Sequence, residues 1–407
     1  MQIRKTNSFI ASFMLAFISC TAIASCNQEA FSVIKDSIES SENLESNSYK
    51  TSKIEKVSRQ LFPLKKRSEK EIQEMLHLLP NELQVYIMRV DIGGDTYNAY
   101  VGIGSSYNND FGIYVELPYY NQIDSINENN ILYVSDYEIG LDFGRLEIKG
   151  RLQSVEDSKF SGMEFIAKTC DTCSLHEVDF ISGFFETTKN IKGKNISYTR
   201  KISLPSIPES NKIPKPIRER INAALHTLGD KQNISKRLLK KAKSSFIDKN
   251  KMPFSLEFNS EYIDSVDLGY VSQDLLMFVE NYYFYEGGAH GDTLFKTRAF
   301  SLQSGEELPT KIESILDMQK QDEILELLKQ KLQPKIDKLY SPTLYIMPDA
   351  FIFDDSGIIF MWQAYSIAPY SSGRILVHVD FDELAPFLKK DSVYNFFFLK
   401  KYRDYRI

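Results

Sequence analysis

The sequence has few residues of the kinds that build metal and nucleophile sites. Its 407 residues include only 5 His, 4 Cys and 1 Trp. It contains no nucleophile elbow, no phosphate-binding loop and no His-Glu-x-x-His zinc helix. These absences argue against the hydrolase, nucleotide-binding and zinc-peptidase classes that depend on such motifs. We therefore expect no catalytic residue set, no cofactor and no enzymatic activity.

The sequence also lacks an excess of positive charge. Its 49 Lys and Arg are outnumbered by 55 Asp and Glu, which leaves a net charge of -6. A nucleic-acid partner requires a basic surface, so we exclude this class of partner. Aromatic residues are abundant instead, with 23 Tyr and 27 Phe. Aromatic side chains suit the pleated, half-buried surface of a β-sheet, and their number predicts a sheet-rich protein.

After the N-terminus, no stretch reaches the roughly 18 apolar residues that a membrane-spanning helix requires. The N-terminus itself begins with Arg4 and Lys5 and continues with an apolar run, Phe9 to Ile18. This run is too short for a stable membrane span. A positive segment followed by a short apolar one is typical of a signal peptide.

The sequence Ile23-Ala-Ser-Cys26 follows the apolar run and resembles the lipobox of bacterial lipoproteins. We expect residues 1–25 to be a lipoprotein signal peptide and Cys26 to carry the lipid, including palmitate. The protein would then be exported and anchored to a membrane, in the periplasm or at the cell surface. The alternative is ordinary cleavage that leaves Cys26 as a free thiol, and Cys20 is a less fitting site for the lipid.

The remaining chain divides by composition and periodicity into four parts. Residues 26–67, rich in Ser, Glu, Asn and Lys, predict a flexible tether. Residues 68–190 begin with a helix over Ser68–Leu79 and continue with period-two alternation, which predicts an antiparallel β-meander domain. Residues 191–393 predict an α+β domain with helices packed on a largely antiparallel sheet, and residues 394–407 an aromatic tail. The expected fold class is α+β.

The sequence predicts four helices in the second domain: Pro216–Leu228, Ser235–Phe246, the longest, Lys311–Leu332, and a short closing helix, Phe381–Leu388. The second of these is basic. Its cations are expected to form a solvated face, and contact with anionic lipid headgroups or with an anionic partner is the alternative. They are Lys236, Arg237, Lys240, Lys241 and Lys243.

Cys170 and Cys173 lie at a turn between two predicted strands. Two nearby thiols in an exported protein most often form a disulfide, and we predict this pairing. Redox activity of the thioredoxin kind would require a helix N-terminus beside the thiols, whereas the neighbouring pattern is strand. A zinc site with His176 lacks further ligands. Free thiols are the remaining alternative.

The segment Tyr282–Thr293 lies between two predicted strands, Leu275–Asn281 and Leu294–Phe300. It combines aromatic residues with a lone histidine among glycines, which permit a sharp turn around it. The residues of interest are Tyr285, Gly287, Gly288, His290 and Gly291. A metal bound by His290 with Glu286 and Asp292 is one alternative, and a purely structural histidine that fixes its own loop is another.

A second motif, Gln363 to Gly373, contains Ile367-Ala-Pro369 flanked by Tyr365 and Tyr370. Together with the glycine-rich segment, it resembles a bacterial envelope domain of unknown function. That domain is best known as the extracellular part of the lysozyme-sensing anti-sigma factor RsiV and as a non-catalytic module of some peptidoglycan deacetylases. Where the family usually carries an acidic residue before the Ile-Ala-Pro-Tyr sequence, this chain has Ser366.

The resemblance implies that both motifs belong to one domain and contribute to one partner-binding surface, formed by Tyr285, Gly287, Gly288, His290, Gly291, Tyr365 and Tyr370. The partner would be a lysozyme-like protein or peptidoglycan, in addition to the membrane that holds the lipid anchor. One alternative is a cell-wall glycan hydrolase or deacetylase accessory with a metal at His290. Another is a structural envelope scaffold, in which the aromatic residues only fill the core.

Overall fold

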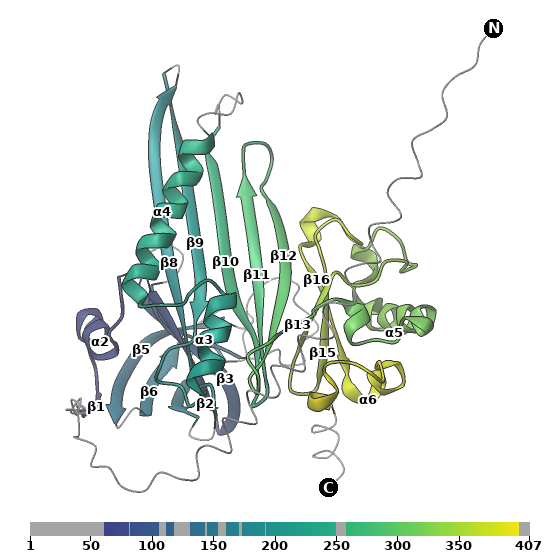
Figure 1. Cartoon of the computed structure of the whole chain (residues 1–407), viewed down its shortest axis with the longest axis horizontal. Helices are drawn as coiled ribbons and strands as arrows, with labels where there is room; N and C mark the ends of the chain where they lie inside the picture. The colour runs from purple at the N-terminus through teal and green to yellow at the C-terminus, as the bar shows by residue number, and fades with distance from the viewer. Residues whose placement is uncertain are drawn as a thin grey trace, which may run out of the picture. The chain divides into compact units, whose positions relative to one another are not determined.

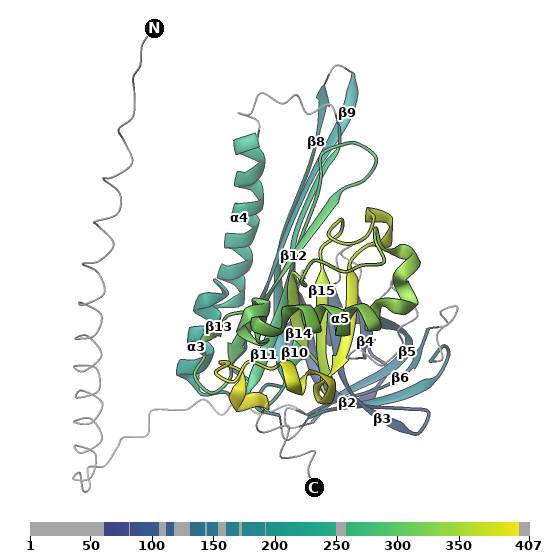
Figure 2. The same cartoon turned by 90° about the vertical axis from the view of Figure 1, so that its right-hand side faces the viewer.

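The structure is a computed structural model, and it describes residues 61–398 except 81, 106–110, 118–130, 143–144, 154–159, 171–172, 192 and 250–257. The predicted signal peptide, Cys26, nearly all of the predicted tether and residues 399–407 lie outside this part of the chain. All described residues belong to one compact unit, residues 59–407 (Figures 1 and 2). The unit combines helices with largely antiparallel sheets, as predicted.

Six consecutive strands form a closed ring in which the last strand pairs with the first. The strands are β2 (Glu82–Ile92), β3 (Asp95–Ser105), β4 (Phe111–Glu116), β5 (Ile131–Asp142), β6 (Arg145–Leu152) and β7 (Glu164–Thr169). Their alternating apolar residues point inward and form one core, which includes Val90, Val101 and Ile148. The short strand β1 (Phe62–Lys65) pairs with β5. Period-two alternation in the sequence therefore reflects the inside and the outside of this ring.

The predicted helix after residue 68 is confirmed as α2 (Glu69–Leu76). Ser68 accepts a hydrogen bond from the backbone of Glu71, and the Glu71 side chain accepts from the backbone of Ser68, so both partners of a capping box are present. Ile72 and Met75 of this helix are buried in the core of the ring. The helix thus begins where the sequence predicts, and its apolar stripe packs against the ring.

β2 changes partner at Ile87. Its second half pairs with β7, and its first half pairs with β8 (Glu177–Ile191), which begins an open sheet. At the change, Ile87 donates its N–H to His176 and accepts a hydrogen bond from Cys170. One strand therefore belongs to both the ring and the open sheet.

The open sheet continues from β8 through β9 (Lys194–Ser206), β10 (Ser260–Val271), β11 (Leu275–Tyr285), β12 (Asp292–Ser301) and the short β13 (Glu307–Leu308). The predicted domain boundary at 190/191 falls near the tip of the β8–β9 hairpin, whose strands pair as far as Ile191 and Lys194. β9 and β10 are parallel, and their connection contains α3 (Lys215–Ala224) and α4 (Lys231–Lys249). α4 runs along β8 and β9 (Figures 1 and 2).

A second sheet of three strands packs on the other face of β10, β11 and β12. It consists of β14 (Ala350–Phe353), β15 (Gly357–Trp362) and β16 (Ile375–Asp380), and α5 (Gln321–Leu332) and α6 (Phe381–Leu384) join the same core. The sequence pattern predicted these strands but did not indicate that they form a sheet of their own. Tyr394, Phe397 and Phe398 are buried in this core, so the start of the predicted tail packs against the body. Within the described part of the chain, no helix has the length and apolarity to cross a membrane.

The prediction of one helix over Lys311–Leu332 was wrong. The segment forms two 3-10 turns, Ile312–Ser314 and Met318–Lys320, before α5 begins at Gln321. Asp317 interrupts the helix, because its side chain accepts the N–H of Gln319 and its own N–H donates to Phe387. A short aspartate side chain that competes for backbone donors favours a new helix start over a helix interior.

A partly buried lysine connects α4 to β2, the strand that the ring and the open sheet share. Lys231 Nζ lies 2.5 Å from Glu82 Oε1 and 3.0 Å from Asp179 Oδ2, and both carboxylates are buried. Burial raises the pKa of Asp179 to about 6, although the Lys231 ammonium acts in the opposite direction. Loss of the lysine would leave two carboxylates buried without a cation, which is strongly destabilising.

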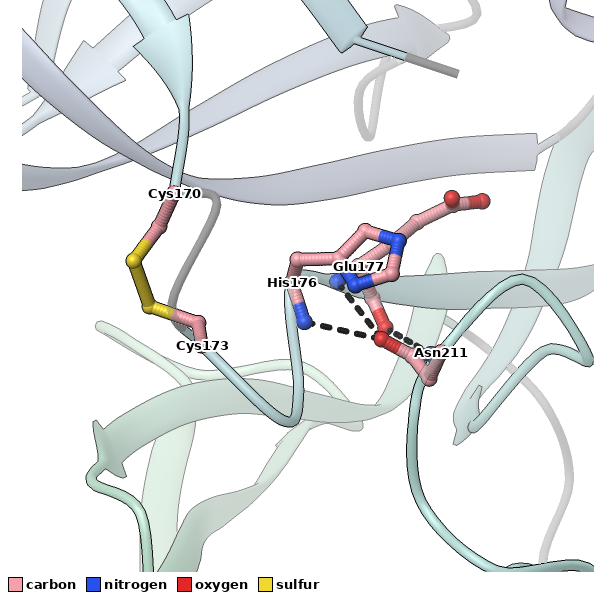
Figure 3. The surroundings of a disulfide bond; sticks show 5 residues. All are labelled: Cys170, Cys173, His176, Glu177 and Asn211. Atoms are coloured by element: carbon pink, nitrogen blue, oxygen red, sulfur yellow. Dashed lines mark hydrogen bonds between the residues drawn. A yellow bond between two sulfur atoms is a disulfide. The ribbon is translucent and has the colours of Figure 1, made fainter. Parts of the chain in front are cut away.

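Cys170 and Cys173 form a disulfide in the loop between β7 and β8 (Figure 3). The loop lies at the point where β2 changes partner. Asn211 holds its far end, because its Oδ1 accepts the N–H groups of His176 and Glu177 and its Nδ2 donates to the carbonyl of Glu177. The disulfide therefore closes a large bulge in what is otherwise a continuous run of pairing along β2.

Asp354 and His378 form an ion pair behind the β14–β15 turn, with 2.9 Å between Asp354 Oδ2 and His378 Nε2. Burial alone would raise the pKa of Asp354, but hydrogen bonds from His378, Ser356 and Gly357 lower it overall. Burial alone would lower the pKa of His378, but the hydrogen bond to Asp354 and its charge raise it overall. The pair is therefore charged over a wider pH range than either group would be alone.

The His378 pair predicts a pH dependence of stability. Because the folded-state pKa of His378 is raised, its contribution is complete below about pH 6.5 and is lost as the pH rises through the folded-state pKa. The lowered pKa of Asp354 makes its contribution complete above about pH 4, and this contribution is lost at lower pH. We expect His378→Gln to reduce the free energy of unfolding by about 1 kcal/mol at pH 5.5 and by less at pH 8.5. Urea unfolding of both proteins at the two pH values measures this difference, and an equal loss at both would contradict the assignment.

Candidate functional site

The two sequence motifs meet in space at the turn that connects β11 and β12. The ring of His290 stacks on the ring of Tyr370, with 3.9 Å between centroids and 11° between planes. His290 Nε2 lies 3.2 Å from the hydroxyl of Tyr365, and His290 Nδ1 lies 2.9 Å from the carbonyl oxygen of Gly291. A carbonyl oxygen only accepts, so the geometry assigns a proton to Nδ1, while Nε2 lies within hydrogen-bond distance of a hydroxyl that can donate to it. The structure thus joins residues 75 or more positions apart in the chain.

Both ends of the second motif are held by the β11–β12 hairpin. The side-chain amide of Gln363 accepts the N–H of Phe295 at 3.1 Å and donates to its carbonyl oxygen at 2.6 Å, as a paired strand would. At the other end, Arg374 donates to Asn281 Oδ1 at 2.5 Å, and its guanidinium lies 4.5 Å from the ring centroid of Phe295. The loop between these points carries Tyr365 and Tyr370. Its position relative to His290 is therefore set by contacts with regular strands.

Tyr365 has an unusual backbone conformation. Its φ is 69°, in the left-handed region, which is uncommon for a bulky residue that is not glycine. Its side chain is 50% exposed, so burial of the ring does not offset the conformational cost. Strained backbone that presents an exposed side chain is concentrated at binding and catalytic sites.

The glycines predicted for this site have separate roles. Gly287 and Gly288 adopt positive φ, of 97° and 106°, and form the turn itself. Gly291 has no positive φ, but a Cβ there would lie 2.6 Å from the ring of Tyr283, so the absence of a side chain allows the turn to lie against that ring. The hydroxyl of Tyr285 donates to the carbonyl of Gly288 at 3.3 Å and stabilises the turn from within.

Exposed apolar residues lie on a neighbouring segment. Tyr340 donates its N–H to Ile367 O, and Asp349 Oδ2 accepts from the N–H of Gln363 and from the hydroxyl of Ser366. Between these two contacts, the segment contains exposed Tyr345 and Ile346, and Tyr340 at its start is also exposed. Scattered exposed apolar residues are ordinary, but several beside an aromatic cluster are typical of an interaction site.

Sequence reasoning missed three residues that build the site. Tyr283 lies against Gly291, and burial, with a smaller contribution from nearby Tyr370, raises its pKa. Gln363 and Arg374 position the loop, as described above. Phe295 pairs with Asn281, and Tyr283 lies two residues further along the same strand, so Tyr283 and Phe295 are on one face of the sheet. Strand alternation could therefore have placed Tyr283 on the face of the candidate site. No sequence signal indicates that Gln363 pairs with a strand backbone.

We call Tyr283, His290, Tyr365 and Tyr370 the His–Tyr surface.

The predicted alternative of a metal at His290 finds no ready set of ligands. Both ring nitrogens of His290 form hydrogen bonds, so a metal would have to displace Gly291 O or Tyr365. Within the described residues, no group of three or more His, Cys, Asp and Glu is placed to hold a metal ion. The hydroxyl of Ser366, which stands where the family that the motif resembles usually carries an acidic residue, donates a hydrogen bond to Asp349 Oδ2.

The remaining predicted site residues lie elsewhere. The disulfide of Cys170 and Cys173 borders a cavity of about 290 Å³, whose wall also includes Tyr100 and Tyr270. These cysteines take no part in the His–Tyr surface. Cys26, the predicted lipid attachment site, is outside the described residues.

The left-handed backbone of Tyr365 predicts that glycine is more stabilising than alanine at this position, the reverse of the usual order. Tyr365→Gly and Tyr365→Ala both remove the ring, but only alanine keeps the strained Cβ. We expect the glycine variant to be more stable than the alanine variant by about 1 kcal/mol. At the exposed Tyr345, which has no positive φ, the alanine variant should be the more stable one. Urea unfolding of the four variants tests this, and a glycine variant less stable than alanine at position 365 would contradict the conformation.

Comparison with known proteins supports a relationship for one part of the chain. The model of the family described as "Protein of unknown function (DUF3298)" matches residues 312–382, a span that contains Tyr365 and Tyr370 but not His290. A DUF3298 family protein from Bacteroides fragilis is 16% identical, with a TM-score of 0.36, over 53% of this chain and 94% of that chain. One from Pseudomonas aeruginosa is 18% identical, with a TM-score of 0.35, over 52% and 94%. No curated protein matches the chain. Residues 312–382 are thus similar to DUF3298, a family whose function is unknown.

Proposed function

We propose that the chain is a lipid-anchored cell-envelope protein that binds a partner through the His–Tyr surface. The observation that carries the proposal is the stack of His290 on Tyr370 beside the exposed, strained Tyr365. These side chains come from two distant segments and converge on one exposed place. A residue that only filled the core would be buried, whereas His290 and Tyr365 are exposed.

The composition of the surface suits recognition of another macromolecule. Tyrosine combines a broad, rigid apolar face with a hydroxyl that can donate or accept, so it contributes much contact area for little loss of conformational freedom. The loop that presents Tyr365 and Tyr370 is held at Gln363 and Arg374, which further reduces the entropic cost of binding. The exposed residues Tyr340, Tyr345 and Ile346 offer apolar area beside it.

The cellular location and the class of partner are argued from the sequence. The signal-peptide pattern and the lipobox-like Ile23–Cys26 support export and acylation at Cys26. The resemblance to the lysozyme-sensing anti-sigma factor and to the deacetylase module supports a lysozyme-like protein or a cell-wall glycan as partner. The net charge of -6 favours a basic protein over an acidic one, since long-range attraction increases the rate of encounter.

Binding should depend on the tyrosines of the surface. We expect Tyr365→Ala and Tyr370→Ala each to weaken binding roughly thirtyfold, as truncation of a central aromatic anchor does. The matched control is Tyr133→Ala, which removes a comparably exposed tyrosine from the ring of strands. Biolayer interferometry with the immobilised chain measures the affinity, with lysozyme and soluble peptidoglycan fragments as separate probes.

The outcomes of this experiment are distinct. Loss of binding in the two surface variants, with the control unchanged, supports the proposal and identifies the partner class by the probe that responds. Binding that is the same in all four proteins places the contact elsewhere and contradicts the role of the surface. Absence of binding to both probes rejects the two partner classes proposed here.

A further inference from the structure

Helix α4 carries a concentration of positive charge within an acidic chain. From Lys231 to Ser245 its sequence contains six Lys or Arg and no Asp or Glu, although Asp and Glu outnumber Lys and Arg in the whole chain. Five of the six cations are exposed: Lys236, Arg237, Lys240, Lys241 and Lys243. The sixth, Lys231, is directed inward to Glu82 and Asp179.

The exposed cations occupy the outer side of the helix. Ile234, Leu238 and Ala242, spaced four residues apart, are buried against β8 and β9. The five cations at 236, 237, 240, 241 and 243 recur at helical spacing on the remaining surface. Arg237 donates weakly to two backbone carbonyls, of His226 and Leu228, and among the residues that the structure describes none of the five forms an ion pair.

The β8–β9 hairpin extends the positive surface past the helix. Lys189 and Lys194 are exposed and lie near the tip of the hairpin. Along β8, Lys189 shares the face of Ile181, which packs against α4. On β9, Lys194 shares the face of Ile202, which also packs against α4. Figures 1 and 2 show the helix lying along these strands. We call these seven residues, five on α4 and two on the hairpin, the α4 ridge.

We propose that the α4 ridge binds the surface of a bilayer that contains anionic phospholipids. The five cations of the helix lie between residues 236 and 243, a rise of about 10 Å at 1.5 Å per residue, so they present a compact positive charge to a plane, and Lys189 and Lys194 extend it beyond the helix. Six of the seven cations are lysines, which act as point charges and do not require the planar, bidentate partners that arginine favours. The apolar side of the helix is occupied by the sheet, so the ridge would lie on the headgroups without inserting.

A bilayer suits the ridge better than a nucleic acid or an acidic protein does. Single-stranded nucleic acids are usually held by stacking on exposed aromatic rings as well as by charge, and from Lys231 to Ser245 the helix has no aromatic residue. Protein interfaces are depleted in lysine and contain buried apolar anchors, whereas the described outward residues of α4 are polar or charged. Diffuse attraction between lysines and anionic headgroups requires neither feature.

The position of the ridge is compatible with the proposed function but does not rest on it. α4 covers one face of the open sheet, while the core that underlies the His–Tyr surface lies on the opposite face. A bilayer at the ridge would therefore leave the His–Tyr surface accessible.

Each basic side chain near an anionic bilayer strengthens binding roughly fivefold, and salt screens this attraction.

Vesicle cosedimentation of the full chain tests the proposal. The vesicles contain phosphatidylcholine alone or mixed with phosphatidylglycerol, and the salt concentration is about 0.1 M or about 1 M. The test variant is Lys240→Glu, Lys241→Glu, Lys243→Glu. The control variant, Lys311→Glu, Lys338→Glu, Lys390→Glu, changes the net charge equally at exposed lysines outside α4. All proteins are prepared identically, so any contribution of the N-terminal region to binding is the same in each.

We expect the wild-type chain to bind the anionic vesicles more tightly than the neutral ones, and high salt to remove the difference. The test variant should lose at least about fiftyfold in affinity for anionic vesicles, and the control variant should lose less than about fivefold. Equal loss in both variants would show a response to net charge alone and would overturn the assignment to α4, as would equal binding to both vesicle types. Tyr365→Ala should bind vesicles as the wild type does, so failure of this proposal is distinguishable from failure of the proposed function.

Discussion

The pairing of the Gln363 side chain with the backbone of Phe295 is the contact on which the candidate site depends. At the edge of β12, the side-chain amide of Gln363 forms the two hydrogen bonds that a neighbouring strand would form with the N–H and the carbonyl oxygen of Phe295. Together with Arg374, it holds a loop of irregular backbone on a hairpin of regular strands. Further contacts hold the middle of the loop, where Tyr340 donates its N–H to Ile367 O and Ile367 and Ala368 are buried in the core. A site built in this way combines the chemical variety of a loop with the rigidity of a sheet.

The strand β2 plays the corresponding role for the fold as a whole. It closes the ring with its second half and begins the open sheet with its first half, so the two parts share one backbone. The disulfide loop lies at the transition, and the partly buried Lys231 connects α4 to the buried Glu82 of β2 and Asp179 of β8. This arrangement explains why residues 59–407 form one compact unit although the ring and the open sheet have separate apolar cores.

Much of the secondary structure could be predicted from local patterns, because these patterns reflect local physics. The capping box at Ser68 and Glu71 predicted the start of α2, and period-two alternation predicted the strands of the ring. Two kinds of feature could not be predicted. Apolar periodicity continues through Lys311–Leu332, but Asp317 caps a 3-10 turn within this segment, and α5 begins only at Gln321. The separation of β14–β16 from the main sheet depends on which strand edges pair, and no residue pattern specifies that choice.

The same distinction applies to the candidate site. The aromatic and glycine residues could be selected from the sequence because their types are unusual in combination, and the structure brings His290, Tyr365 and Tyr370 together. Their geometry depends on Gln363, on Arg374 and on the left-handed backbone conformation of Tyr365. Glutamine, arginine and tyrosine are common residue types, so nothing in the sequence indicates these three contributions. The roles of these residues follow only from contacts between segments far apart in the chain.

His290, Tyr365 and Tyr370 should form one ordered layer of rings in solution. Nitrogen-15 NMR of the histidine side chains tests it most directly, since the shifts of the two ring nitrogens report which one carries the proton. We expect Nδ1 of His290 to carry a proton, held by the carbonyl of Gly291, and the ring protons to be shifted by the stacked Tyr370. A ring with the proton on Nε2, or with shifts that do not respond to Tyr370→Ala, would contradict it.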